Sequence, residues 1–150
     1  MQTNPYLLFN GNCEEAFRFY ERALGAKIET VLTHEGTPAE QHVAPEFRKK
    51  VLHGRINLKG HTIMASDCPP ERYAKPQGFS LTLTVQDAAD AERLYHALEE
   101  GGQVGMPIQE TFWAVRFGMV TDRFGIPWMI NCEKARMDTT EMEECTSAVR

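Results

Sequence analysis

Histidine is the residue type in this sequence best suited to metal binding or to proton transfer near neutral pH. His53 and His61 fall on two neighbouring strands of a predicted hairpin, and Glu35 or His42 could join them from the preceding loop. A divalent metal needs several imidazole or carboxylate ligands that converge on one point. The sequence has no H-x-H or H-x-x-x-H spacing. The pattern therefore favours surface or hydrogen-bonded histidines over a metal site.

An aromatic and a cationic side chain lie close together in the second half of the sequence. Trp113 and Arg116 fall at a predicted strand-to-strand hairpin. An aromatic wall and a fixed guanidinium would suit a flat or anionic ligand. In the alternative interpretation, Trp113 packs against the other half of the chain and Arg116 pairs with Asp122 or Glu110. The sequence leaves both interpretations open.

Composition and charge restrict the class of protein. The 150-residue chain has 42% hydrophobic residues and a net charge of -5, which suits one acidic domain with a buried core. The basic cluster at 48–50 is short, so we expect no nucleic-acid partner. No apolar run is long enough to span a membrane, and the N-terminus does not resemble a signal peptide. None of the four cysteines forms a C-x-x-C pair, which favours free thiols in a reducing compartment, the cytoplasm.

Two stretches have the periodicity and end signals of helices. The first predicted helix covers 13–24, follows a capping box of Asn12 and Glu15, and ends at Gly25. The second covers 88–101 and begins after Asp87, a residue type favoured at helix N-caps. Strand patterns occupy 4–10, 26–33, 51–59, 61–66, 79–86, 103–109, 115–121 and 127–132.

The two halves of the chain repeat one pattern. The predicted caps Asn12 and Asp87 lie 75 positions apart, and so do the helical residues Tyr20 and Tyr95. A common offset in caps, strands and helix faces indicates two copies of a βαβββ unit. We therefore predict a single two-module domain over 1–134, followed by a flexible polar tail. Its parts are module one at about 3–68, a linker at 69–78, module two at about 79–134, and the tail at 135–150.

This arrangement resembles the vicinal oxygen chelate superfamily of glyoxalases, bleomycin-resistance proteins and extradiol dioxygenases. It is most similar to the PhnB-like branch, often labelled 3-demethylubiquinone-9 3-methyltransferase. Three segments carry the resemblance, at 16–26, at 60–67 and at 113–118 together with 122–128. Arg123 replaces the proline usual in the D-P-F-G turn. The resemblance implies an α+β fold of two βαβββ modules that form a glyoxalase/bleomycin-resistance-type open barrel.

The resemblance also implies a ligand cleft on the inner face of the sheets. Phe79, Leu81, Leu83 and Val85 alternate with polar residues, so we expect them to meet the helix and to leave the polar residues for the cleft. The 75-residue offset extends this cleft face to the first strand, starting at Pro5. The predicted ligand-binding residues are Leu7, Phe9, Met64, Ser80, Thr82, Thr84, Trp113, Arg116, Met129 and Asn131.

Metal enzymes of the superfamily take their ligands from the first, fourth, fifth and eighth strands. Two of these positions lie seven residues before the predicted caps and are occupied by Pro5 and Ser80. The other two lie four residues after Gly60 and Gly125 and are occupied by Met64 and Met129. None offers an imidazole or a carboxylate, and we read the methionines as adaptable pocket lining. We therefore predict no metal and no cofactor.

Known catalytic motifs are also missing from the sequence. It has no G-x-S-x-G elbow and no Walker A loop. Binding of S-adenosylmethionine usually uses a glycine-rich loop between a first strand and a helix, whereas Gly101-Gly102 follows a helix here. The sequence thus argues against the methyltransferase label.

Three functions stay open at this point. The chain could be a metal-free protein that binds a small molecule in its cleft, which the missing ligand positions favour. It could instead be a metabolic enzyme of the superfamily, of lyase, dioxygenase or isomerase type, with an unusual metal or none. Third, the chain could be a dimeric interaction module whose cleft binds no ligand because side chains fill it. We also expect a homodimer, because superfamily clefts are commonly completed between subunits.

Overall fold

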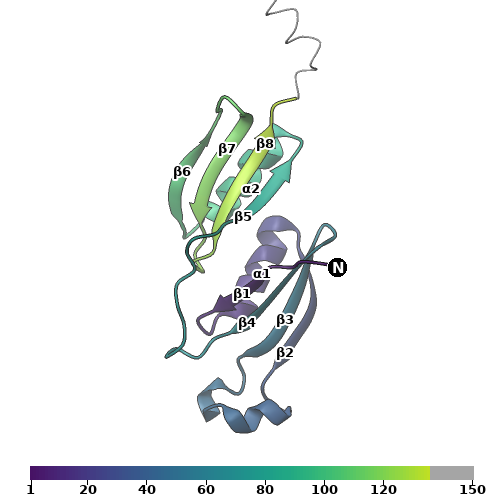
Figure 1. Ribbon diagram of the computed structural model, residues 1–150, viewed down its shortest axis with the longest axis vertical. Helices are drawn as coiled ribbons and strands as arrows, with labels where there is room; N and C mark the ends of the chain where they lie inside the picture. Colours follow the sequence, from purple (N-terminus) through teal and green to yellow (C-terminus); the bar gives the residue numbers. More distant parts are fainter. Residues whose placement is uncertain (136–150) are drawn as a thin grey trace, which may run out of the picture.

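The computed structural model describes residues 1–135 and contains two modules of like construction (Figure 1). The tail predicted at 135–150 lies outside the described residues except for its first residue. The elements follow the order βαβββ–βαβββ, with two short 3-10 helices inserted in the first module. No helix within 1–135 has the length and apolar character needed to cross a membrane.

Module one forms a four-stranded sheet in the order β1-β4-β3-β2. The β1–β4 pair is parallel, and the other two pairs are antiparallel. Its elements are β1 (Tyr6–Phe9), α1 (Cys13–Leu24), β2 (Lys27–Thr33), η1 (Pro38–His42), η2 (Pro45–Phe47), β3 (Val51–Leu58) and β4 (His61–Asp67).

Module two repeats this topology, with the strand order β5-β8-β7-β6 and a parallel β5–β8 pair. Its elements are β5 (Leu81–Val85), α2 (Ala88–Glu99), β6 (Gln103–Gln109), β7 (Ala114–Thr121) and β8 (Pro127–Glu133). The predicted fold class is confirmed, and the two sheets stay open because no strand of one pairs with a strand of the other.

The backbone at the start of α1 is bound by a side chain from a distant strand. Asn12 precedes the helix but makes no capping hydrogen bond, and its buried Oδ1 has no partner. Asp67, at the end of β4, instead accepts a hydrogen bond from the backbone N–H of Cys13 at 2.9 Å. Its other oxygen accepts from the N–H of Val51 at 2.8 Å. One carboxylate therefore joins the starts of α1 and β3 to the end of β4.

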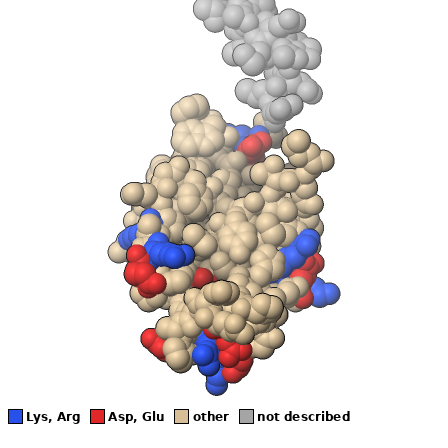
Figure 2. Space-filling model, turned by 60° about the horizontal axis from the view of Figure 1, so that its bottom comes forward, with Lys and Arg blue, Asp and Glu red and all other residues tan. Residues whose placement is uncertain are grey.

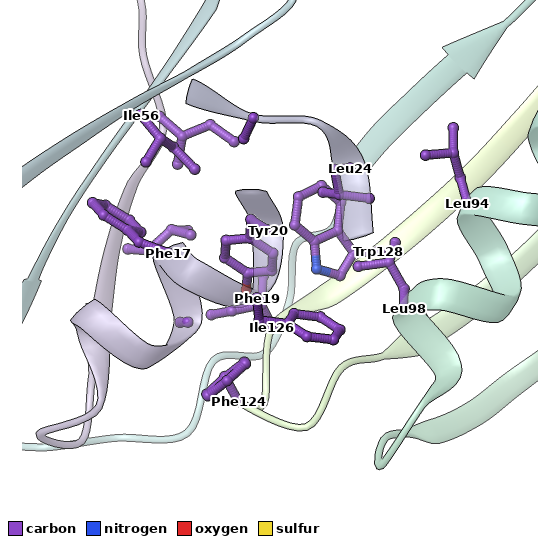
Figure 3. Packing of buried hydrophobic residues seen from close by; sticks show 14 of the residues in the cluster. Phe17, Phe19, Tyr20, Leu24, Ile56, Leu94, Leu98, Phe124, Ile126 and Trp128 are labelled. Carbon is purple, nitrogen blue, oxygen red and sulfur yellow. The ribbon is translucent and has the colours of Figure 1, made fainter. Parts of the chain in front are cut away.

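One hydrophobic core extends through both modules. The helices α1 and α2 contact each other, and large side chains from β8 and the β7–β8 turn fill the space beside them (Figure 3). Tyr20 of α1 packs edge-on against Trp128 of β8, with ring centroids 5.5 Å apart. Phe124 packs against Phe19 and Phe9 of module one. The modules are thus held together on the helix side of the molecule.

The buried carboxylate of Asp122 lies at this junction and accepts four hydrogen bonds. Its Oδ2 accepts from the Tyr20 hydroxyl at 2.6 Å and from Trp128 Nε1 at 2.8 Å. Its Oδ1 accepts from the backbone N–H groups of Phe124 and Ile126 at 2.9 and 3.0 Å. Burial raises the pKa of Tyr20 well above its usual value, and Asp122 raises it further. The hydroxyl therefore keeps its proton and donates a hydrogen bond to the carboxylate.

We expect Asp122→Asn to lower the free energy of unfolding by about 2–4 kcal/mol. If the amide oxygen of the asparagine accepts from the two backbone N–H groups, its NH2 group faces the donors of Tyr20 and Trp128 and cannot accept from them. Urea denaturation measures the change. Asp90→Asn on the exposed side of α2 is the matched control and should change stability by less than about 0.5 kcal/mol. Equal stability of the Asp122 variant and the wild type would show that these bonds do not hold the modules together.

Candidate functional site

A groove of about 460 Å³ opens between the two modules, and we call it the inter-module groove. One wall is β5, which has a neighbour on one side only because it is an edge strand. The opposite wall is the end of the β3–β4 hairpin, from Leu58 to Ile63. Pairing of β1 with β4 begins at Tyr6 and Met64, so the first residues of β4 extend past β1. Two strand edges therefore face the groove.

The groove has an apolar interior and a polar rim. Leu24, Leu94 and Trp128 line it and are almost completely buried, so they form its floor. Leu81, Leu83 and Val85 of β5 also line it and pack against the core. Thr82 and Thr84 alternate with them, are exposed, and bring hydroxyl groups to the rim.

The structure brings four of the predicted ligand-binding residues together. Thr82 lies beside Met129, and Thr84 beside Asn131, in the parallel β5–β8 pair. The two threonines line the groove, whereas Met129 and Asn131 lie half-buried on the adjoining open face of the sheet. Ser80 directly precedes β5 and is also half-buried.

The face predicted for Leu7 and Phe9 is wrong. Both are buried in the core, at 2% and 0% exposure, while Tyr6 and Leu8 are the exposed residues of β1. The cause is a loop that is one residue longer in module one. Phe9 ends β1 three positions before Asn12, but Val85 ends β5 two positions before Asp87. The helices keep the 75-residue offset and the strands do not, and a shift of one residue reverses the face of a strand.

Arg116 also lies on a different side from the one predicted. Its Nε donates a hydrogen bond to Oε1 of Glu92 on α2, so its side chain lies on the helix side of the sheet. Gly118, two residues further along β7, shares that side, because an added Cβ there would lie 2.7 Å from the Tyr95 ring. The bond with Glu92 raises the pKa of Arg116. This guanidinium is therefore not a cation of the groove.

Trp113 and Met64 lie on the open faces and outside the groove lining. Trp113 is 45% exposed and packs edge-on against Phe112 and Phe117, at centroid distances of 4.8 and 5.4 Å. Met64 is half-buried beside Tyr6. Phe79, which was expected to meet the helix, is 48% exposed because it precedes the first paired residue of β5.

The residues present do not fit the divalent metal of the superfamily. The neighbours of Met64 and Met129 on adjacent strands are Tyr6 and Thr82, so neither pair offers an imidazole or a carboxylate. Within residues 1–135, no three His, Cys, Asp or Glu side chains are grouped closely enough to hold a metal ion.

The histidines singled out in the sequence are separated in the structure. His61 lies at the hairpin turn opposite Leu58, about 16 Å along β3 from His53 at 3.3 Å per residue. His53 Nδ1 lies 3.4 Å from the hydroxyl of Tyr6. His34 Nδ1 bonds to the carbonyl of Lys50 at 2.9 Å. His53 and His61 therefore cannot coordinate the same ion.

Two basic residues at one end of the groove, Lys59 and His61, were not predicted as site residues. They flank Gly60 in the turn between β3 and β4. The sequence predicts the turn at Gly60, but a turn by itself indicates only that the chain reverses and does not indicate a binding site. The turn lies across the groove from β5 because of the way the two modules pack, and the sequence of neither strand predicts that packing.

Two four-stranded sheets, each carrying one helix and left open, define the glyoxalase/bleomycin-resistance fold of the vicinal oxygen chelate superfamily. The chain belongs to the family described as 3-demethylubiquinone-9 3-methyltransferase, which it matches over residues 1–131, and thus to the PhnB-like branch of that superfamily.

Individual relatives agree with this family. Protein YjdN of Escherichia coli K12 is 37% identical over 142 residues, covering 89% of this chain and 97% of the relative. The crystal structure of PA1353 from Pseudomonas aeruginosa is similar with a TM-score of 0.81 and 45% identity, over 90% of this chain and 99% of that one. A PhnB protein from Bacillus cereus has a TM-score of 0.75 at 22% identity, over 88% and 99% of the two chains, which supports the fold.

We expect the purified, untagged protein to hold no stoichiometric divalent metal, because the four positions that the resemblance assigns to metal ligands offer no imidazole or carboxylate. They are Pro5, Met64, Ser80 and Met129. Elemental analysis by mass spectrometry measures the content per chain. About one zinc, nickel, iron or manganese per chain would contradict the expectation.

Proposed function

We propose that this protein binds a small molecule in the inter-module groove without the help of a metal ion. The observation that carries the proposal is the groove itself, whose volume of about 460 Å³ falls within the range of about 300–1,000 Å³ typical of ligand pockets. Its lining is mainly apolar with a few hydroxyl groups, which is the usual composition of such pockets.

The threonine hydroxyls at the rim support a binding role. Thr82 and Thr84 point away from the core side of β5, where a ligand could accept or donate hydrogen bonds. The edge of β5 adds backbone groups that no neighbouring strand of the described chain uses, since β5 pairs only with β8 among residues 1–135. A ligand that lies along β5 would thus find polar partners at the rim and apolar contacts at the floor.

The geometry does not favour methyl transfer. An S-adenosylmethionine site of the usual kind needs a doubly wound parallel sheet with its glycine-rich loop. Here each sheet contains one parallel pair and two antiparallel pairs. Another enzymatic activity in the same groove is the alternative, but none of the described residues that line the groove indicates a particular reaction.

We further propose that the protein is a homodimer and works in the cytoplasm. Cys13, Cys68 and Cys132 are buried and not disulfide-bonded, which suits a reducing compartment. Large apolar side chains are exposed on the open sheet faces, among them Tyr6, Leu8 and Leu32. In Figure 2, charged side chains lie toward the margins of one broad face, and its centre is uncharged. Such a surface suits contact with a second copy.

We expect a particle of twice the 17.0 kDa chain mass in light scattering at micromolar concentration. Leu8→Glu should shift the protein toward the monomer, because it places a charge on the proposed apolar interface. Arg93→Gln on α2 is the control and should leave the mass unchanged. A wild-type mass of one chain at every concentration would exclude the dimer.

For the binding site we expect that Thr82→Leu weakens the strongest hit from a metabolite screen at least about tenfold, because it removes a rim hydroxyl and narrows the groove. Ligand-observed NMR provides the screen, and calorimetry measures the affinities. Thr30→Leu is the matched control, since Thr30 is an exposed strand threonine outside the groove. Unchanged affinity in the Thr82 variant, with folding intact, would place the site elsewhere.

A further inference from the structure

We propose that the ligand of the inter-module groove is an amphiphilic anion, with an apolar body on the floor and a carboxylate or similar group at the Lys59–His61 end. The inference rests on the proposed function and adds the chemical class of the ligand. It is carried by the distribution of charge around the groove and by the backbone conformation of Lys59.

The lining of the groove is basic in an otherwise acidic protein. The chain has a net charge of -5, yet among residues 1–135 no aspartate or glutamate lines the groove. Lys59 and His61 are its ionisable residues, and both lie at the hairpin end. Within residues 1–135, neither side chain forms an ion pair, whereas Arg55 on the same hairpin is paired with Glu29 at 2.8 Å. The positive charge at this end is thus available to a ligand.

Lys59 is held in an unusual backbone conformation at this place. Its φ is +48°, and it is the one non-glycine residue within 1–135 with positive φ. Two-residue hairpin turns of this kind prefer asparagine or aspartate at this position, so a lysine costs conformational free energy. Asn57 supports the turn by accepting a hydrogen bond from the N–H of Gly60 at 2.8 Å. Strained residues of this kind concentrate at functional sites, because the strain fixes the direction in which a side chain leaves the backbone.

The remainder of the groove suits the apolar part of such a ligand. A hydrocarbon or aryl group above the floor would cover the apolar side chains of the walls, which are half-buried, and burial of that surface supplies most of the affinity. These side chains are Leu58, Leu81, Leu83 and Val85. Arg116 cannot take the place of the lysine, since it is bonded to Glu92 on the helix side. The anion must therefore lie toward the β3–β4 turn.

The test compares octanoate with 1-octanol as probes, which share the apolar chain and differ in charge. Trp113→Phe serves as the background, so that fluorescence reports only Trp128 on the floor. We expect octanoate to bind at least about fivefold more tightly than 1-octanol, and Lys59→Met to remove most of this preference. Lys27→Met is the matched control, because Lys27 is exposed on β2 and lies outside the groove.

The outcomes separate the inference from the proposed function. Octanoate preference that is lost with Lys59 and kept with Lys27 supports both. Equal binding of octanoate and 1-octanol, unaffected by Lys59→Met, overturns the anionic ligand and leaves a neutral-ligand groove. Absence of binding of either probe at millimolar concentration overturns both.

Discussion

The carboxylate of Asp122 is the interaction on which the arrangement of the two modules depends. It is almost fully buried, and a buried carboxylate is costly unless hydrogen bonds replace its hydration. Four donors meet this need, two from the backbone of its own turn and two from the side chains of Tyr20 and Trp128. Because Tyr20 belongs to module one and Trp128 to module two, satisfying one charge fixes the modules relative to each other.

This joint determines where the groove opens. The modules meet through α1, α2 and the β7–β8 turn, so their sheets are held together on the helix side and stay unpaired at the facing edges (Figure 3). Trp128 contributes both to the junction between the modules and to the groove. Its indole N–H bonds to Asp122, and its ring lines the groove floor. The depth and lining of the groove thus follow from the same hydrogen bonds that stabilise the junction.

Periodicity and turn chemistry predicted most of the fold. The first helix was placed at 13–24, where α1 lies, and the second was extended two residues beyond the end of α2 at Glu99. These signals are local, since amphipathic spacing and glycines act within one element. Asn12 is the N-cap residue of α1, as predicted, but its side chain makes no capping hydrogen bond. The first N–H of the helix, that of Cys13, donates instead to Asp67, 54 residues away in the chain, a contact that no local signal predicts.

The candidate site was predicted less completely, for reasons of register and packing. Thr82 and Thr84 were assigned to the correct face of β5 by simple alternation. Leu7 and Phe9 were assigned by transfer from module two, and one extra loop residue reversed their face. Arg116 was predicted as a ligand-binding residue, with pairing to Asp122 or Glu110 as the alternative, and neither occurs. Asp122 is already satisfied by four donors, and Glu110 pairs with Lys134. Lys59 joins the site only because the modules pack as they do.

We propose that ligands bind between the modules and not on the open sheet faces. Methyl NMR of the leucines tests it most directly, with the strongest hit of the metabolite screen as the titrant. We expect the shifted signals to belong to leucines of the groove, Leu24, Leu83 and Leu94 above all, while those of Leu8 and Leu32 on the exposed faces stay unchanged. Shifts confined to Leu8 and Leu32 would contradict it.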